Sequence, residues 1–270
     1  MTAGASDSAE AERIAELHEE LNHHIYLYYE KDDPEISDEE YDQLFSELQA
    51  LEAKHPELIT GDSPTQRVGA PASTSFAPVE HAVPMLSLAN ARTEEELTAW
   101  EARVRNHLLR RDVDPGEITF VTEPKIDGLA ISLTYENGRL VQGATRGDGR
   151  VGEDVTGNIE TIKTVPDQID DAPPLIEVRG EVYLPIPDFA ELNQKRVDAG
   201  LPAFANPRNS AAGSIRQNDP RAAAERPLAV WSYGIGATDG VSFASHSEEI
   251  EWLRERGFHV NPDIAVHDSI

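Results

Sequence analysis

The chain has 270 residues, 39% hydrophobic and 27% charged, a composition typical of a soluble globular protein with one large domain or two smaller ones. Its 50 acidic and 23 basic residues give a formal net charge of −27, which opposes binding of nucleic acid by the chain as a whole. It has no cysteine, no apolar run near the roughly 20 residues of a membrane-spanning helix, and no secretion signal in Met1–Arg13. We therefore expect a cytoplasmic protein without disulfides.

The N-terminal part predicts a pair of helices. Over Glu10–Tyr29, apolar side chains recur at spacings of three and four residues, which indicates an amphipathic helix. Ser37 and Glu40 then form a capping box that opens a second amphipathic helix. Residues 55–84 are rich in Pro, Ser, Thr and Gly and have little periodicity, so we interpret them as an ordered connector to a second body.

Strand patterns predominate beyond the connector. We predict strands over residues 119–123, 129–135, 140–145, 175–184 and 228–235, and a helix over residues 187–199. Asn137-Gly138 is a hairpin signal between two of these strands. The predicted class is α+β, with a small helical hairpin domain over residues 1–70 and an antiparallel-sheet domain over residues 71–270.

One short segment, Glu123-Pro124-Lys125-Ile126-Asp127-Gly128, carries candidate chemistry. Its lysine is predicted at the end of one strand, with glycine allowing a tight turn into the next. Alone, a K-x-D-G pattern is a weak signal and favours a solvated lysine and aspartate in a hairpin connection. Three further motif segments follow it in order: Thr145–Gly149, Glu177–Val182 and Asn206–Ser214.

These segments, with Tyr28-Tyr29, Pro34–Asp42 and Pro84–Leu88 before them, resemble bacterial NAD-dependent DNA ligases and their adenylation (nucleotidyltransferase) domain. The resemblance runs from about residue 10 to the end of the chain. It implies that Lys125 attacks the adenylyl phosphorus of NAD, releases nicotinamide mononucleotide (NMN) and keeps AMP as a phosphoramidate. AMP would then pass to the 5′-phosphate of a nick in double-stranded DNA.

The resemblance also implies an adenylate pocket and assigns catalytic roles to Lys125, Asp127 and Arg146. The pocket residues that it implies are Ser87, Leu88, Glu123, Lys125, Arg146, Glu181, Arg208 and Tyr233. A lysine amine attacks only in its neutral form, which desolvation or neighbouring cations such as Arg146 and Arg208 favour.

Individual roles in this pocket follow the family pattern. Glu123 resembles the acceptor for the adenine amino group, and Glu181 the partner of the ribose hydroxyls or of a catalytic cation, Mg²⁺ or Mn²⁺. Arg146 and Arg216 would face phosphate oxygens that gain charge during displacement. Tyr233 either stacks on adenine or is an ordinary core aromatic of its strand.

By the same resemblance, the helical hairpin would hold NMN through Tyr28, Tyr29, Asp38, Tyr41 and Asp42. Asp38, Tyr41 and Asp42 stand at i, i+3 and i+4 and so share one helix face. Read without the family, Tyr41 is a core residue, and the two aspartates are first-turn carboxylates that the helix dipole favours.

The family continues with two more lysine motifs of the adenylation domain, an OB-fold, a four-cysteine zinc module, a helix-hairpin-helix region and a BRCT domain. None of these follows in the 270 residues, so we expect an N-terminal piece whose adenylation domain is truncated at its C-terminal end. Zinc is expected only in the missing part. This piece alone is not expected to seal nicks, whereas the full-length enzyme would bind nicked DNA as a monomer.

Two other classes share parts of this pattern. ATP-dependent ligases and capping enzymes contain K-x-D-G but lack the tyrosine–aspartate hairpin. A catalytically incomplete nucleotide-binding module of a related lysine nucleotidyltransferase, or an acidic interaction domain, would bind reversibly without a covalent adduct. The excess of carboxylates is interpreted as adaptation to a salt-rich, halophilic source.

Overall fold

The computed structural model describes residues 3–28, 35–61, 63–66, 76–87 and 90–270, without the side chains of residues 3–8 and Asp38. The helices are α1 (Ala3–Tyr26), α2 (Asp38–Lys54), η2 (Pro56–Leu58), η3 (Pro64–Gln66), α3 (Glu94–Leu109), α4 (Thr156–Ile159), α5 (Ile186–Asp198), α6 (Pro207–Ile215), α7 (Pro220–Ala224) and α8 (His246–Glu255). The strands are β1 (Pro78–Glu80), β2 (Phe120–Thr122), β3 (Leu129–Glu136), β4 (Arg139–Thr145), β5 (Val151–Glu153), β6 (Leu175–Tyr183), β7 (Ala229–Asp239) and β8 (Ala265–His267).

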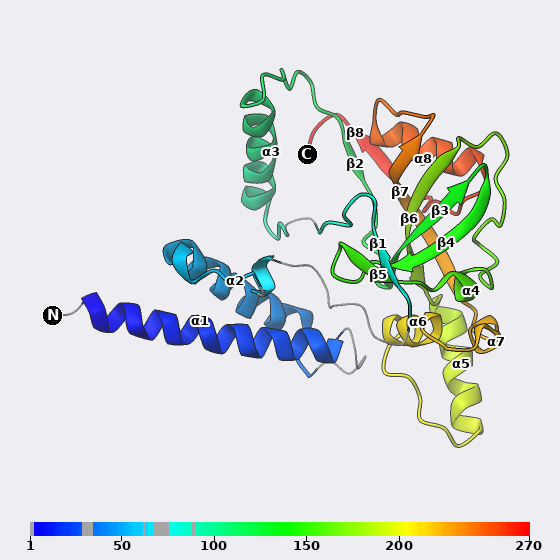
Figure 1. The fold of residues 1–270 in the computed structure, drawn as a ribbon, viewed down its shortest axis with the longest axis horizontal. Coiled ribbons are helices and arrows are strands. Elements are labelled where there is room, and N and C mark those ends of the chain that lie inside the picture. The colour runs from blue at the N-terminus through cyan, green and yellow to red at the C-terminus, as the bar shows by residue number, and fades with distance from the viewer. Residues whose placement is uncertain (1–2, 29–34, 62, 67–75, 88–89) are drawn as a thin grey trace.

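Helices α1 and α2 form the predicted N-terminal hairpin, which lies to one side of the sheet-bearing body in Figure 1. Leu17, Leu21 and Leu48 are fully buried between the two helices and form their own small core. The capping box at the start of α2 is confirmed, because the backbone N–H of Ser37 donates to Glu40 Oε2 (2.8 Å) and that of Glu40 donates to Ser37 Oγ (3.2 Å).

The main sheet has four antiparallel strands in the order β4-β3-β6-β7, which confirms the α+β class. Strands β3 and β4 join through the predicted hairpin turn, where Asn137 (φ 49°) and Gly138 (φ 82°) both adopt left-handed backbone angles. Strand β3 pairs with β6 over the full length of β3, so that Ile131 lies opposite Gly180.

One face of this sheet is apolar, because side chains alternate along each strand. Ile131, Leu133 and Tyr135 of β3 are fully buried on this face. They belong to one core with Ile159 of α4 and Leu253 of α8, so the helices that cover this face anchor the sheet.

The opposite face carries polar side chains. In β6 these are Glu177, Arg179 and Glu181, and Glu181 lies opposite Trp231 of β7. Among the described residues, the core that covers the other face has no counterpart on this one, which is therefore available for a site.

Strand β2 corrects the prediction that residues 119–123 belong to the same antiparallel core. It is shorter than predicted and pairs with β8, with Val121 opposite Val266, in a separate two-stranded sheet. Local alternation predicts a strand but carries no information on its partner. The domain boundary predicted near residue 70 lies in the segment 67–75, outside the described residues.

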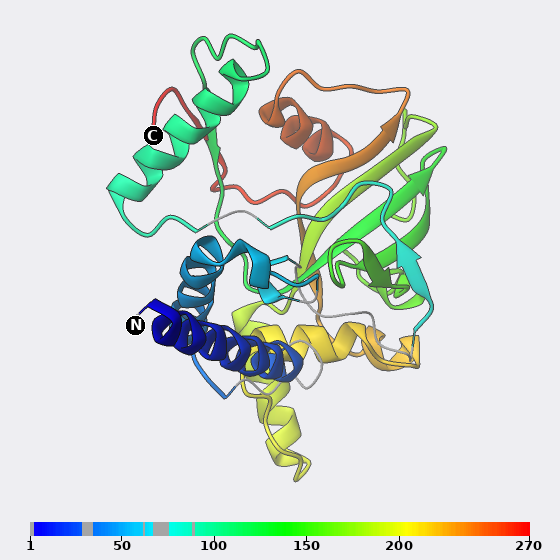
Figure 2. The same ribbon diagram turned by 60° about the vertical axis from the view of Figure 1, so that its left-hand side comes forward.

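Helix α3 stands apart from the sheet in both Figure 1 and Figure 2, and the end of the chain lies near it. It contains no buried residue. In the described part of the chain, no helix combines the length and apolar character that crossing a membrane requires.

Candidate active site

A cavity of about 680 Å³ opens over the polar face of the four-stranded sheet. Residues predicted for the nucleotide pocket that line it are Tyr28, Ser87, Glu123, Lys125, Arg146, Glu181, Arg208 and Tyr233. They come from the end of the hairpin, the segment that follows the connector, the lysine segment, the turn after β4, two strands of the sheet and helix α6. Arg216, predicted to face phosphate oxygens, also lines the cavity.

Lys125 lies in the irregular segment between β2 and β3, and its exposed side chain borders the cavity. Gly128 lies three residues further on. The prediction that this glycine allows a tight turn is wrong, because its backbone does not adopt a positive φ. A Cβ atom at this position would lie 2.1 Å from the carbonyl oxygen of Val182. Glycine is therefore required for the close approach of the lysine segment to β6 rather than for a tight turn.

Asp127 forms an ion pair with Arg208, with 3.2 Å between Oδ1 and Nη1. Asn206 caps α6 by accepting a hydrogen bond from the backbone N–H of Asn209 (2.7 Å), and Pro207 occupies the first helical position. This local structure fixes Arg208 in the first turn, where its guanidinium also lies over the ring of Tyr28.

Arg146 enters the cavity from a tight turn that follows β4. Gly147 has a φ of 56°, and a Cβ on it would lie 1.9 Å from the carbonyl oxygen of Val151. Asp148 closes the turn by accepting hydrogen bonds from the backbone N–H groups of Arg150 and Val151, both at 2.8 Å. The Arg146 side chain donates to Ser87 Oγ at 3.4 Å, which joins the turn to the segment that follows the connector.

Glu181 of β6 is a strongly perturbed carboxyl group of the cavity. Burial raises its pKa to about 7. The positive charges of Arg208, Lys125 and Arg146 lower this pKa, in that order of effect, but do not offset the burial. A carboxyl group that changes charge near neutral pH, beside three cations in a cleft, is a candidate functional group.

Two other predicted pocket residues are also desolvated. Partial withdrawal from water raises the pKa of Glu123 above its usual value, although the side chain still reaches solvent. Burial raises the pKa of the Tyr233 hydroxyl, and the nearby Glu181 carboxylate adds to this rise. Tyr233 thus lies on the wall of the cavity rather than in the apolar core.

Arg216 is held by a buried carboxylate. Its Nε donates to Glu153 Oε2 at 2.9 Å, and the side chain of Glu153 is only 2% exposed. Thr145 Oγ1 donates to the same carboxylate oxygen at 3.3 Å. Glu153 therefore positions a cation at the cavity wall, because its own buried carboxylate is held in place and pairs with the partly exposed Arg216.

The hairpin contributes fewer side chains to the cavity than predicted. Tyr28 lines it, whereas Tyr41 and Asp42 are not among the lining residues. Tyr41 packs against the hairpin core and stacks on Phe45, with 6.1 Å between ring centroids. Tyr29 and Leu88 lie outside the described residues, and so does the side chain of Asp38.

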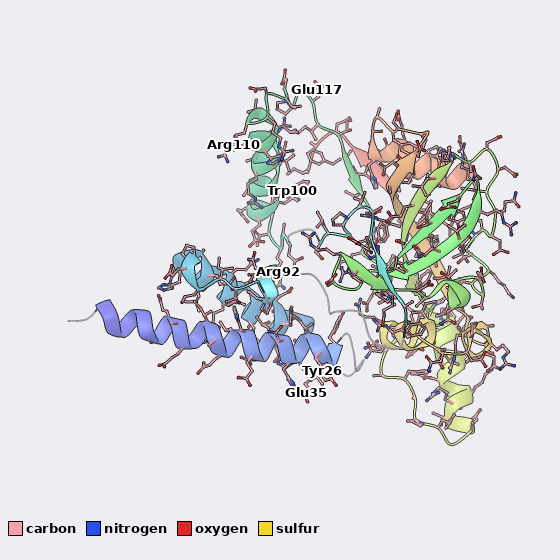
Figure 3. All side chains as sticks on the ribbon, in the orientation of Figure 1. Tyr26, Glu35, Arg92, Trp100, Arg110 and Glu117 are labelled. Carbon is pink, nitrogen blue, oxygen red and sulfur yellow. The ribbon has the colours of Figure 1, made fainter. Side chains whose placement is uncertain are left out.

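Asp42 instead contacts the segment that precedes α3. It forms an ion pair with Arg92, labelled in Figure 3, and accepts a hydrogen bond from Asn90 Nδ2 at 3.3 Å. The predicted NMN-binding carboxylate is thus engaged by the chain itself in this arrangement.

Several lining residues are not among the predicted ones. The cavity also includes Arg179, Trp231 and Asn261. Arg179 donates to the carbonyl oxygens of Val83 (2.5 Å) and Pro84 (3.2 Å), which holds the connector against the sheet. The period-two alternation that places Glu181 on the polar face also places Arg179 there and was the available signal.

Comparison with known proteins gives consistent results along the whole chain. Residues 73–270 match the family model described as the NAD-dependent DNA ligase adenylation domain. Residues 7–69 match the model described as the DNA ligase-like N-terminal NAD⁺-binding domain.

Curated relatives are named DNA ligase. The one from Desulforudis audaxviator is 54% identical over 260 residues, which are 96% of this chain and 38% of that protein. The one from Rubrobacter xylanophilus is 55% identical over 269 residues (98% and 38%), and the one from Chloroflexus aurantiacus is 51% identical over 271 residues (96% and 38%). The chain thus spans well under half the length of these relatives. With a family model matching most of its residues, the chain belongs to the NAD-dependent DNA ligase family.

Proposed function

We propose that this chain is the adenylation module of an NAD-dependent DNA ligase and that Lys125 becomes covalently adenylated. The observation that carries the proposal is that Lys125, Glu181 and Arg146 line one cavity. A nucleophile, a titratable carboxyl group and a phosphate-binding cation within one cleft are the parts that nucleotidyl transfer requires.

In the proposed step, the Lys125 amine loses a proton and forms a bond to the adenylyl phosphorus of NAD. The bond between this phosphorus and the bridging oxygen breaks, and NMN leaves with the electron pair. Arg146 and Arg216 stabilise the negative charge that grows on the phosphate oxygens. Asp127 positions Arg208, which in turn contacts Tyr28 at the end of the hairpin where NMN would lie.

For the base and sugar, Glu123 accepts a hydrogen bond from the adenine amino group, and Tyr233 stacks on adenine. Glu181 accepts hydrogen bonds from the ribose hydroxyls. Ser87 and Leu88 lie at the mouth of the pocket in this proposal, and Tyr29, Asp38, Tyr41 and Asp42 complete the NMN site. Glu181 also supplies the kind of oxygen ligand that Mg²⁺ or Mn²⁺ prefers. Such a cation would neutralise phosphate charge when bound.

We further propose that the whole protein transfers AMP to nicked double-stranded DNA in replication and repair. The names of the relatives support this role, and their greater length supports the expectation that these 270 residues do not seal nicks alone.

We place the protein in the cytoplasm as a monomer. The net charge of −27 supports a salt-rich source.

The test is intact-protein mass spectrometry after incubation with NAD, with ATP as the comparison. We expect one adenylyl group per chain with NAD and none with ATP. Lys125→Ala should abolish the adduct, whereas Lys163→Ala and Lys195→Ala, at two other exposed lysines, should retain it. An adduct that persists in Lys125→Ala, or that maps to another residue, would contradict the assignment.

A further inference from the structure

Two adjacent histidines and a glutamate converge at the end of the hairpin that carries Tyr28. His23 and His24 lie in the last turn of α1, and Glu35 lies two residues before Ser37, the N-cap of α2. One ligand atom from each of the three lies within 4.8 Å of the other two. Figure 3 shows Glu35 at the same end of α1 as Tyr26.

The distance between His23 and Glu35 fits two ligands of one metal ion. Nε2 of His23 and Oε2 of Glu35 are 3.3 Å apart, which is long for a hydrogen bond between these groups. Tetrahedral zinc with bonds of about 2.0–2.1 Å to nitrogen and oxygen separates its ligands by about 3.3–3.4 Å. The imidazole of His24, whose centroid is 5.4 Å from that of His23, also offers a ring nitrogen within 4.8 Å of the ligand atoms of His23 and Glu35.

His24 supplies an independent observation. Its Nδ1 atom is buried and has no hydrogen-bond partner within the described part of the chain. A buried imidazole nitrogen without a partner destabilises the fold. A metal ion bound at Nδ1 would supply the missing partner.

We propose that His23, His24 and Glu35 form a binding site for Zn²⁺ or a similar divalent transition-metal ion. Two imidazoles and one carboxylate are a recognised zinc ligand set that leaves a fourth position for water. None of the three residues lines the cavity over the sheet. The ion would clamp the C-terminal end of α1 to the N-terminal end of α2 and so fix the end of the hairpin beside Tyr28.

The histidine–glutamate pair on helix α8 serves as a comparison. His246 Nδ1 lies 3.0 Å from Glu249 Oε2 on helix α8, and no third ligand joins this pair among the described residues. It is a charge-assisted contact without the convergence that a metal requires. His246→Asn is therefore a matched control for loss of one histidine.

The experiment titrates the 270-residue chain, prepared without a histidine tag and freed of metal by a chelator, with Co²⁺ and then with Zn²⁺. We expect the intense visible absorption of tetrahedral Co²⁺, with one ion bound per chain and displaced by Zn²⁺. His24→Asn and Glu35→Gln should each weaken binding about tenfold or more, since even outer-shell changes cost about 10–100-fold in affinity. His246→Asn should bind as the wild type does.

A second readout does not depend on the spectrum. Saturating Zn²⁺ should raise the thermal unfolding midpoint of the wild type, because a ligand that binds the folded state stabilises it. Circular dichroism establishes that each variant is folded. Absence of saturable binding, or equal binding by the wild type and a His23→Asn/His24→Asn/Glu35→Gln variant, would overturn the proposal and leave an ordinary His23–Glu35 contact.

Discussion

The guanidinium of Arg208 lies over the ring of Tyr28, with 4.6 Å between its Cζ atom and the ring centroid. The same guanidinium pairs with Asp127, two residues after the lysine. The hairpin and the lysine segment, which lie far apart in the sequence, thus meet through a single arginine.

Replacing the Tyr28 ring should slow adenylation by NAD. A cation–π contact contributes about 0.5–2 kcal/mol, so Tyr28→Leu should reduce the rate of adduct formation by roughly two- to thirtyfold. Tyr28→Phe keeps the ring and should retain most of the rate. The measurement is the rate of AMP-adduct formation by mass spectrometry at subsaturating NAD.

Tyr26 provides the control, because it lies at the end of α1, two residues before Tyr28, with 47% of its surface exposed, and does not line the cavity. Tyr26→Leu should leave the rate unchanged. Equal losses in Tyr28→Leu and Tyr26→Leu would show that the hairpin as a whole, rather than the aromatic ring beside Arg208, governs the rate.

Adduct formation should increase as the pH rises through about 7, because Glu181 ionises in this range. The ionised carboxylate accepts ribose hydroxyl protons and attracts a cation more strongly than the neutral acid does. Glu181→Gln should lower the rate and remove the component of the pH profile near 7. An unchanged profile in the variant would exclude Glu181 as its source.

Glu181 should also affect stability with a defined sign. Its pKa rises from 4.5 to about 7, so the folded state holds the proton more tightly than the unfolded state does. The contribution of this group to the unfolding free energy therefore falls as the pH rises from about 4.5 to about 7. In ligand-free protein, Glu181→Gln should gain stability relative to the wild type over that interval, as measured by urea unfolding. A difference independent of pH would contradict this linkage.

Arg216→Met should destabilise the protein strongly. It removes the ion pair between Arg216 and the buried carboxylate of Glu153, which is 2% exposed, and breaking a buried pair by removing one member costs about 3–5 kcal/mol. Glu153→Gln/Arg216→Met should recover part of this loss, because the amide is easier to bury than the charge. Urea unfolding at pH 7 measures each free energy.

The control is Arg221→Met, which breaks an ion pair with Asp219 whose two side chains are 91% and 50% exposed. Exposed pairs contribute little net stability, so little change is expected. A similar small loss at both arginines would mean that burial of Glu153 does not control the energy of its pair.

Much of the fold could be predicted because its signals are local. The capping residue Ser37 and the turn residues Asn137 and Gly138 determine backbone geometry within a few residues, and the structure confirms all three. Alternation along β3 and β6 likewise reports a sheet with one apolar face.

Partners distant in the sequence could not be predicted in the same way. Nothing in residues 120–122 indicates that their partner is the strand containing Val266. The predicted elements do not include α3, because a helix without buried residues has no strong apolar stripe to recognise.

In the candidate site, too, local motifs could be recognised in the sequence, whereas contacts between distant residues could not. Resemblance of short motifs gave Glu181 and Tyr233, which line the cavity. The contact between Asp42 and Arg92 joins residues fifty positions apart and depends on how the hairpin packs. Trp231 reaches the cavity through the register between β6 and β7, where it lies opposite Glu181. Such registers follow from tertiary packing rather than from a local pattern.

Salt should stabilise this chain. Its 50 acidic residues outnumber the 23 basic ones, so the folded state, which brings the charges close together, has a net electrostatic self-repulsion. Raising the ionic strength from about 0.1 to 1 M shortens the screening length from about 10 to 3 Å. The same screening weakens exposed ion pairs such as Arg221–Asp219, but such pairs contribute little net stability. We therefore expect the thermal unfolding midpoint to rise with KCl.

Sucrose, which has no charge, controls for exclusion of the solute from the protein surface. If the midpoint stays constant or falls in KCl, charge repulsion does not govern the stability of the folded chain, and the inference of a salt-rich source loses its physical basis.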